Sequence, residues 1–146
     1  MKNILLQALM SFGSCWGFAI CLNVPRKAFI ASGITGMCGW MSYEWCFNFG
    51  HSKVGASLIG TIIIGIVGLI FARQLEMPVT IFTIPALMPL VPGGTAYEAL
   101  KQLVMGHVLK AQVLTVHMFL IAGAIAIGFM IAQIFSQYYL KKVNDK

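Results

Sequence analysis

The chain has 146 residues, of which 59% are hydrophobic and only 10% are charged. An ordinary soluble domain carries about 25% charged residues, and a small one needs that polar surface to cover its core. Composition therefore excludes a soluble globule. It predicts an all-α polytopic membrane helix bundle that forms a single transmembrane domain over residues 1–146, with the lipid bilayer as its solvent. The net charge of +6 does not indicate nucleic-acid binding, because the ten Lys and Arg residues are dispersed between apolar runs.

The first three apolar runs predict three uninterrupted spans, at about residues 4–22, 28–47 and 54–72. A helix of about 20 mostly apolar residues crosses the hydrocarbon layer. Small residues four positions apart let such helices approach closely in lipid, which favours a packed bundle or a homo-oligomer. These pairs are Gly13 and Gly17, Ala56 and Gly60, and Ala124 and Gly128.

The fourth apolar run, about residues 78–107, is broken in its middle. Interior prolines remove helical hydrogen bonds and clash with the preceding turn, and this run contains Pro78, Pro85, Pro89 and Pro92, followed by Gly93 and Gly94. Thr95 with Glu98 three residues later is the pattern of a capping box, so a new half-helix is predicted from about Thr95 towards His107. A fifth span follows at about residues 112–138.

The distribution of basic residues bears on the number of crossings. Five crossings place six Lys and Arg residues on one side of the membrane and four on the other, whereas four crossings place five on each side. The positive-inside rule therefore favours five spans, with the C-terminus in the cytoplasm. The alternative is a broken segment that re-enters on its own side.

The break at Pro92–Gly94 has two interpretations. Irregular backbone at membrane depth is tolerated where it is buried in protein or lines a cavity, and in transporters it lies at substrate sites. The alternative is a kinked structural helix or an ordinary loop. On the first interpretation, backbone N–H groups and the Tyr97 hydroxyl hold a ligand, and the substrate-binding residues are Pro89, Pro92, Gly93, Gly94, Thr95, Tyr97 and Glu98.

Other polar residues have weaker interpretations. Arg26 and Arg73 are supporting charges that could attract an anion, although setting the topology explains Arg73 as well. His117 is an intramembrane ionisable residue, which is a functional candidate by default, but it could also hydrogen-bond a neighbouring helix. No nucleophile–base pair, phosphate-binding loop or Cys/His metal spacing is present in the sequence, so we expect no enzyme, no metal and no cofactor.

The segment Ile84–Tyr97, IPALMPLVPGGTAY, resembles the I-P-x-x-x-P-L-x-P-G-x-x-x-Y signature of the threonine/serine exporter (ThrE-like) family. The turn Asn23–Arg26 and the Trp- and Glu-containing end of the second span resemble its small-subunit branch, the YjjB type. This resemblance implies one subunit of a two-component exporter in the bacterial inner membrane, which needs a larger, YjjP-type membrane subunit. It also implies a small carboxylate-bearing substrate, either threonine and serine or a dicarboxylate such as succinate. Gly94 departs from the bulkier residue of many relatives and leaves the substrate open. The rival hypothesis is a non-transporting assembly or regulatory subunit.

Overall fold

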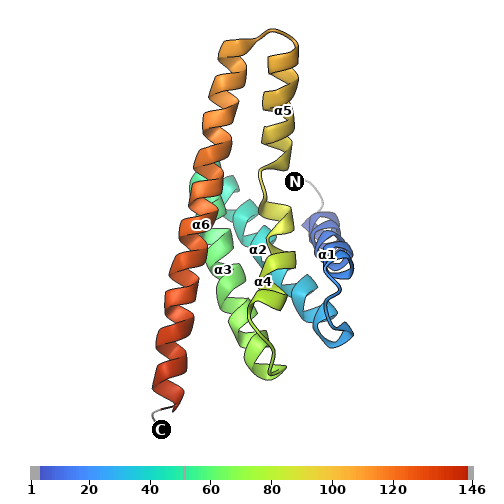
Figure 1. Ribbon diagram of the computed structural model, residues 1–146, viewed down its shortest axis with the longest axis vertical. Coiled ribbons are helices and arrows are strands. Elements are labelled where there is room, and N and C mark those ends of the chain that lie inside the picture. The colour runs from blue at the N-terminus through green and yellow to red at the C-terminus, as the bar shows by residue number, and fades with distance from the viewer. Residues whose placement is uncertain (1–3, 51, 145–146) are drawn as a thin grey trace.

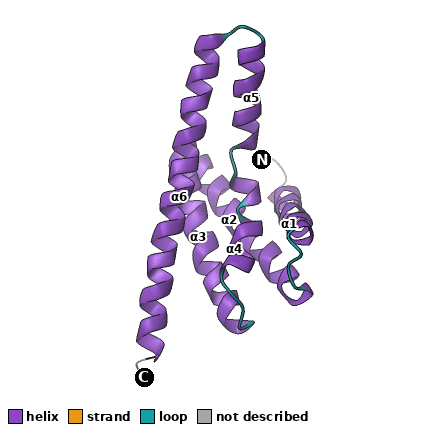
Figure 2. Cartoon of the chain, viewed as in Figure 1, coloured by secondary structure: helices purple, strands orange, loops and turns teal. Residues whose placement is uncertain are grey.

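The computed structural model describes residues 4–50 and 52–144, with side chains as far as residue 135. All regular structure in these residues is helical (Figures 1 and 2). This confirms the all-α membrane helix bundle. The helices are α1 (Ile4–Cys21), α2 (Phe29–Asn48), α3 (Lys53–Gln74), α4 (Thr80–Ala86), α5 (Gly93–Val104) and α6 (Val108–Asn144), and two short 3-10 turns are η1 (Arg26–Ala28) and η2 (Met88–Leu90).

The chain reverses its direction after α1, α2, α3 and α5, whereas α5 continues in the direction of α4 (Figure 1). Among the described residues, three helices are long and apolar enough to cross a membrane: α1, α3 and the Val108–Phe135 part of α6. The α4–η2 segment is apolar but short. The path agrees with five passes through the bundle, and the crossings themselves and their orientation stay a prediction.

Two turns of the same geometry close one end of the bundle. The residues after α1 and α3, Asn23 and Glu76, have left-handed φ angles of 53° and 52°. The next amides fold back onto the helices, with Val24 N–H donating to the Ala19 carbonyl and Met77 N–H donating to Ala72, each at 3.0 Å. This is the Schellman pattern, which satisfies the last carbonyls of a helix, and a proline follows each turn because the helix has ended. Arg26 and Arg73 lie beside these turns, so this end is called the basic end.

Glycines on α2 permit close contacts with two neighbouring helices. A Cβ atom on Gly33 would lie 2.5 Å from the Phe12 ring of α1, and the space beside Gly36 is filled by the Cys15 side chain. Beside Gly39, the Ile64 side chain of α3 fills the equivalent space. With so little room, α2 packs against α1 on one face and α3 on another, as small residues allow in lipid.

The predicted small-residue pairs have different outcomes. Ala56 is fully buried, and a Cβ atom on Gly60 would lie 2.9 Å from the Leu90 side chain, so this pair is used within the chain. Gly128 is used as well, because a Cβ atom there would lie 2.8 Å from the Leu58 carbonyl oxygen. A Cβ atom on Gly13 or Gly17 would meet nothing within 4 Å, so the described residues leave that face of α1 uncovered.

Helices α3 and α6 run parallel in a register that glycines set. Gly128 meets Thr61, and Ala132 meets Gly65 one turn further along both helices. Continuing this register backwards places Lys53, the first residue of α3, at the level of Leu120. The first third of α6 therefore extends beyond the start of α3, as Figure 1 shows. At 37 residues α6 is about 55 Å long, well above the roughly 30 Å of a hydrocarbon core.

The projecting part is a helical hairpin of α5 and the start of α6, residues 93–119, and is called the hairpin below. The two helices of the hairpin pack mainly against each other, since the extensive contacts of α5 are all with α6. Gly106, with a φ angle of 80°, closes the turn, and His107 N–H donates to the Gln102 carbonyl at 2.9 Å. Its exposed large apolar side chains are Leu100, Leu103, Val104, Met105, Val108, Leu109, Val113, Val116 and Phe119.

Candidate functional site

The break between α4 and α5 is built by prolines and closed by backbone hydrogen bonds. After η2, Val91 is extended, and Gly93 N–H donates to the Val91 carbonyl at 2.7 Å. The first helical bond of α5 follows, from Ala96 N–H to the Pro92 carbonyl at 3.0 Å. N–H groups at the start of a helix have no acceptor inside the helix, so the missing N–H of proline costs nothing there. A helix can therefore start directly after Pro92. The half-helix therefore begins at Gly93, two residues before the predicted Thr95.

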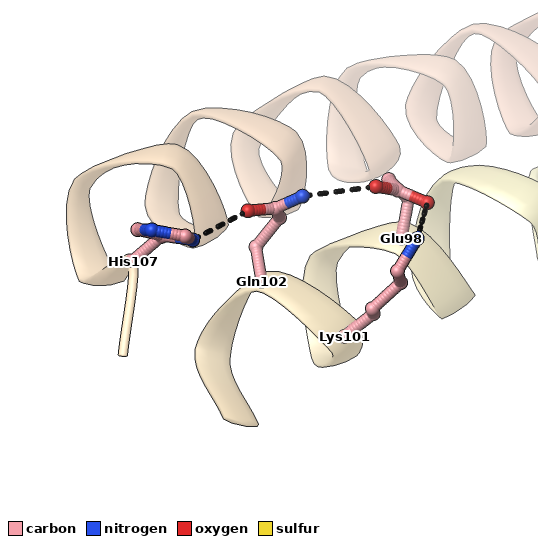
Figure 3. A network of polar contacts seen from close by, with 4 residues as sticks. All are labelled: Glu98, Lys101, Gln102 and His107. Atoms are coloured by element: carbon pink, nitrogen blue, oxygen red, sulfur yellow. Dashed lines mark hydrogen bonds and ion pairs between the residues drawn. The ribbon is translucent and has the colours of Figure 1, made fainter. Parts of the chain in front are cut away.

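The predicted capping box is not formed. The residue before α5 is Pro92, no side chain caps the helix start, and Thr95 already lies in its first turn. Glu98 turns instead towards the tip of the hairpin (Figure 3), where its carboxylate accepts from Gln102 Nε2 at 3.0 Å and pairs with Lys101 Nζ at 3.8 Å. Gln102 Oε1 in turn contacts His107 Nδ1 at 3.1 Å. Glu98 therefore belongs to a polar network along α5 and not to the helix start.

The remaining break residues form an open surface. Gly93, Gly94 and Tyr97 are partly or fully exposed, as is Thr95. A Cβ atom on either glycine would meet nothing within 4 Å. The first turn of a helix leaves backbone N–H groups without an acceptor inside the helix. The N–H groups of Gly93 and Ala96 are used in the hydrogen bonds above, so the N–H groups of Gly94 and Thr95 are the donors that remain. The break thus presents backbone donors on an uncovered face.

Pro89 contributes to a cavity that the sequence did not reveal. This cavity of about 280 Å³ lies between α1, α2 and η2 and is called the outer cavity; it is lined by Leu6, Gln7, Met10, Ser11, Ser14, Trp40 and Pro89. Gln7 Nε2 donates to Glu44 Oε1 at 3.3 Å, and Ser11 Oγ donates to the Gly36 carbonyl at 3.2 Å. Residues 7, 11 and 14 share one helix face, so the periodicity of polar residues within an apolar span was the signal that could have found them.

The predicted supporting charges are not brought to the break. Arg26 begins η1 and Arg73 lies in the last turn of α3, both at the basic end, whereas Pro92–Gly94 lies where the hairpin leaves the bundle (Figure 1). His117 is exposed on the hairpin part of α6. Of the ten predicted site residues, the structure groups those from Pro92 to Glu98 and separates Arg26 and Arg73 from them.

Comparison with known proteins identifies the family of this chain. A family model described as "Threonine/Serine exporter, ThrE" matches residues 7–135, which include the break, most of the outer cavity and most of α6. An uncharacterized protein of Haemophilus influenzae is 28% identical over 107 residues, a stretch that covers 73% of this chain and 36% of that protein. The chain thus matches about a third of the length of this curated relative. No solved structure matches the chain. With nearly the whole sequence covered by the family model, the chain belongs to the threonine/serine exporter family.

Proposed function

We propose that this chain is the small membrane subunit of a two-component exporter. It carries a small carboxylate-bearing metabolite, threonine or serine or a succinate-like dicarboxylate, out of the bacterial cytoplasm across the inner membrane. The observation that carries the proposal is the family match over residues 7–135, which contains the proline-glycine break. Broken helices with free amides are the elements that bind substrates in secondary transporters.

The geometry of the break supports a role in transport. The amides of Gly94 and Thr95 have no helical acceptor, so they can receive a carboxylate. Pro89, three residues before Pro92, lines the outer cavity together with the Gln7 and Ser14 side chains. A solute that leaves this cavity passes close to the start of α5. The break and the outer cavity are therefore proposed to act together at the exit side.

The need for a larger partner has two supports. First, the matched stretch covers only 36% of the Haemophilus influenzae relative, so in that protein the equivalent of this unit shares a chain with a larger part. Second, the hairpin rises beyond the level of Lys53 with large apolar side chains exposed, among them Val104 at 87% and Leu109 at 80%. Surfaces of this kind are covered by protein or lipid. We assign the larger, YjjP-type subunit as the cover, and a second copy of this chain is the alternative that the assay below detects.

The test is release of metabolites from cells that express this chain with and without the larger subunit. We expect threonine, serine or succinate to accumulate in the medium only when both are present, as measured by mass spectrometry of the medium. Release by this chain alone would indicate that copies of the chain suffice. If none of these metabolites is released with both subunits in the membrane, the exporter hypothesis is wrong and a non-transporting assembly role replaces it.

The role of the break is tested by replacing Gly93 with leucine. The site has open space, so the variant should insert and fold, and a bulky side chain should then block the amides of the first turn. We expect release to fall at least tenfold, which corresponds to about 1.4 kcal/mol. Gly123→Leu on α6 is the matched control, because its site is equally open and lies outside the break. Unchanged release by Gly93→Leu at equal membrane levels would remove the break from the transport mechanism.

A further inference from the structure

A second cavity lies near the basic end, between α4 and α6, and is called the inner groove; its surface is mainly apolar and carries a few polar groups. Its volume is about 130 Å³, and α3 contributes its floor at Gly65. This is slightly less than the cavity of about 150 Å³ that holds a benzene molecule, but the groove also opens to the surface at Thr80 and Gln133, so it has room for part or all of a small solute. The lining residues are Gly65, Val79, Thr80, Thr83, Phe129, Ala132 and Gln133.

The polar groups of the inner groove are available to a ligand. The Thr83 hydroxyl donates to the Val79 carbonyl at 3.1 Å, which leaves its oxygen free to accept. Neither the Thr80 hydroxyl nor the Gln133 amide makes a hydrogen bond with any residue that the structure describes. Thr80 and Gln133 are both exposed at the surface of the described chain. An unpaired carboxamide in the apolar part of a membrane helix is unfavourable there, because lipid offers it no partner. Gln133 therefore needs a partner that the described chain does not supply.

The charge of the inner groove limits what that partner can be. None of its lining residues is charged. Arg73 lines a different cavity, which shares Ala132 with the inner groove but is otherwise formed by the Ile66, Ile70 and Phe135 side of α3 and α6. Burying a dianion without a cation is strongly unfavourable, whereas a solute without net charge can satisfy hydroxyl and amide groups. The groove therefore suits a small, net-neutral, hydrogen-bonding solute and disfavours a dicarboxylate.

An apolar cluster separates the inner groove from the outer cavity. Ile64, Ala86 and Leu90 are buried together, and Trp40, Leu87 and Ile125 pack around them. The α4–η2 segment thus has Thr80 and Thr83 in one cavity, Pro89 in the other, and the apolar cluster between them. A short segment that ends in prolines and glycines is the kind of element that can shift while the long helices stay in place.

We propose that the inner groove is the binding site for the exported solute on the basic-end side, that it selects a net-neutral amino acid, and that the α4–η2 segment gates the passage to the outer cavity. The inference rests on the proposed export function and deepens it, since it names a site and a substrate class. The solute enters between Thr80 and Gln133. Movement of Leu87 and Leu90 away from Ile64 and Ile125 opens the way towards Pro89.

Binding is tested by site-directed labelling of the whole chain in membrane vesicles, without any need for transport. The four native cysteines are replaced by serine or alanine, and Gln133→Cys is reacted with a methanethiosulfonate reagent. L-serine or L-threonine should slow the labelling several-fold, and succinate should not. Met130→Cys is the matched control and should show no protection, because Met130 is exposed on α6 as Gln133 is but does not line the groove.

Function is tested with Thr80→Val and Gln133→Leu, which remove the polar groups and keep the approximate side-chain volumes. Each should reduce export of serine or threonine about tenfold, the effect expected when one hydrogen bond to a desolvated ligand is lost. Met130→Leu should export as the wild type does.

The outcomes separate this inference from the proposed function. Wild-type export with no protection of Gln133→Cys and no effect of either variant would overturn the inner groove and leave the exporter intact. Protection by succinate in place of the amino acids would overturn the substrate class. Reduced assembly of Gln133→Leu with normal export per molecule would show that Gln133 binds a neighbouring helix, which overturns its role in the groove. Protection by serine or threonine would support the site even if the export assay failed.

Discussion

At the level of single residues, the same amino acid has opposite roles at different positions on one helix. Gly128 and Gly123 both lie on α6, five residues apart. A side chain at Gly128 would meet the Leu58 carbonyl oxygen at 2.8 Å, whereas Gly123 faces open space. A backbone carbonyl cannot move aside as a flexible side chain can, so Gly128 is required for the close approach of α3 and α6.

This difference predicts the effect of two matched substitutions. Gly128→Ala should lower the free energy of unfolding by about 1–3 kcal/mol, because a methyl group is forced into a packed contact. Gly123→Ala should leave it unchanged or slightly higher, since alanine is the better helix former. Unfolding in mixed detergent micelles measures both. Equal destabilisation by the two variants would mean that the α3–α6 contact is not as close as described.

Residues also explain why one local prediction was wrong. Thr95 and Glu98 match the capping-box pattern, but Pro92 and the two glycines after it permit the helix to begin earlier. The pattern was correct about a half-helix in this segment and wrong about its first residue. Glu98 then finds Lys101 and Gln102 as partners one turn along the same helix, which the i,i+3 and i,i+4 spacing allows.

At the level of elements, the hairpin is the part of the fold that least resembles the expected bundle. The apolar run that continues into α6 predicts a simple fifth span, yet the start of α6 pairs with α5 beyond the level of Lys53. Its stability depends on the turn at Gly106, whose φ angle of 80° is favourable for glycine and costly for most other residues.

Substitution of Gly106 tests the hairpin as a separate element. Gly106→Val should destabilise it by about 1–2 kcal/mol, the cost of the left-handed conformation for a residue with a Cβ atom. Limited proteolysis in detergent micelles should then cut the variant between α5 and α6 faster than the wild type. Gly106→Asn is the matched control, because asparagine tolerates this conformation and should be cut at the wild-type rate. Equal cleavage of the two variants would contradict the described turn.

At the level of the whole molecule, the path of the chain places the basic end and the tip of the hairpin at opposite extremes (Figure 1). With five crossings, six of the ten Lys and Arg residues belong to the side of the basic end and four to the side of the hairpin tip; the six are Arg26, Lys27, Arg73, Lys141, Lys142 and Lys146. Cytoplasmic loops carry the excess of such residues. This asymmetry predicts that the basic end faces the cytoplasm and the hairpin faces the outside.

Accessibility of single cysteines checks this orientation. In a chain without native cysteines, a membrane-impermeant maleimide should label His107→Cys in intact cells and Lys27→Cys only after the membrane is permeabilised. Both positions are outside the apolar spans, so neither substitution disturbs the packed contacts. Labelling of both in intact cells would reject five crossings, and labelling of Lys27→Cys alone would reverse the orientation.

Much of this protein follows from the sequence by itself. Long apolar runs determine that it is a helical membrane protein, and Asn23 and Pro25 end the first helix by local chemistry that needs no tertiary contact. The prolines before Gly93 likewise determine that the fourth run is broken, because each removes a local hydrogen bond.

Only the tertiary structure decided which residues meet. It selected Gly36 and Gly128 over Gly13 for close contacts, set the register of α3 against α6, and brought Gln133 beside Thr80 and Gln7 beside Pro89. These pairs are far apart along the chain, and no local pattern encodes how two helices rotate and slide against each other. The two cavities on either side of the α4–η2 segment exist for that reason, and they could not be predicted from the spacing of residues alone.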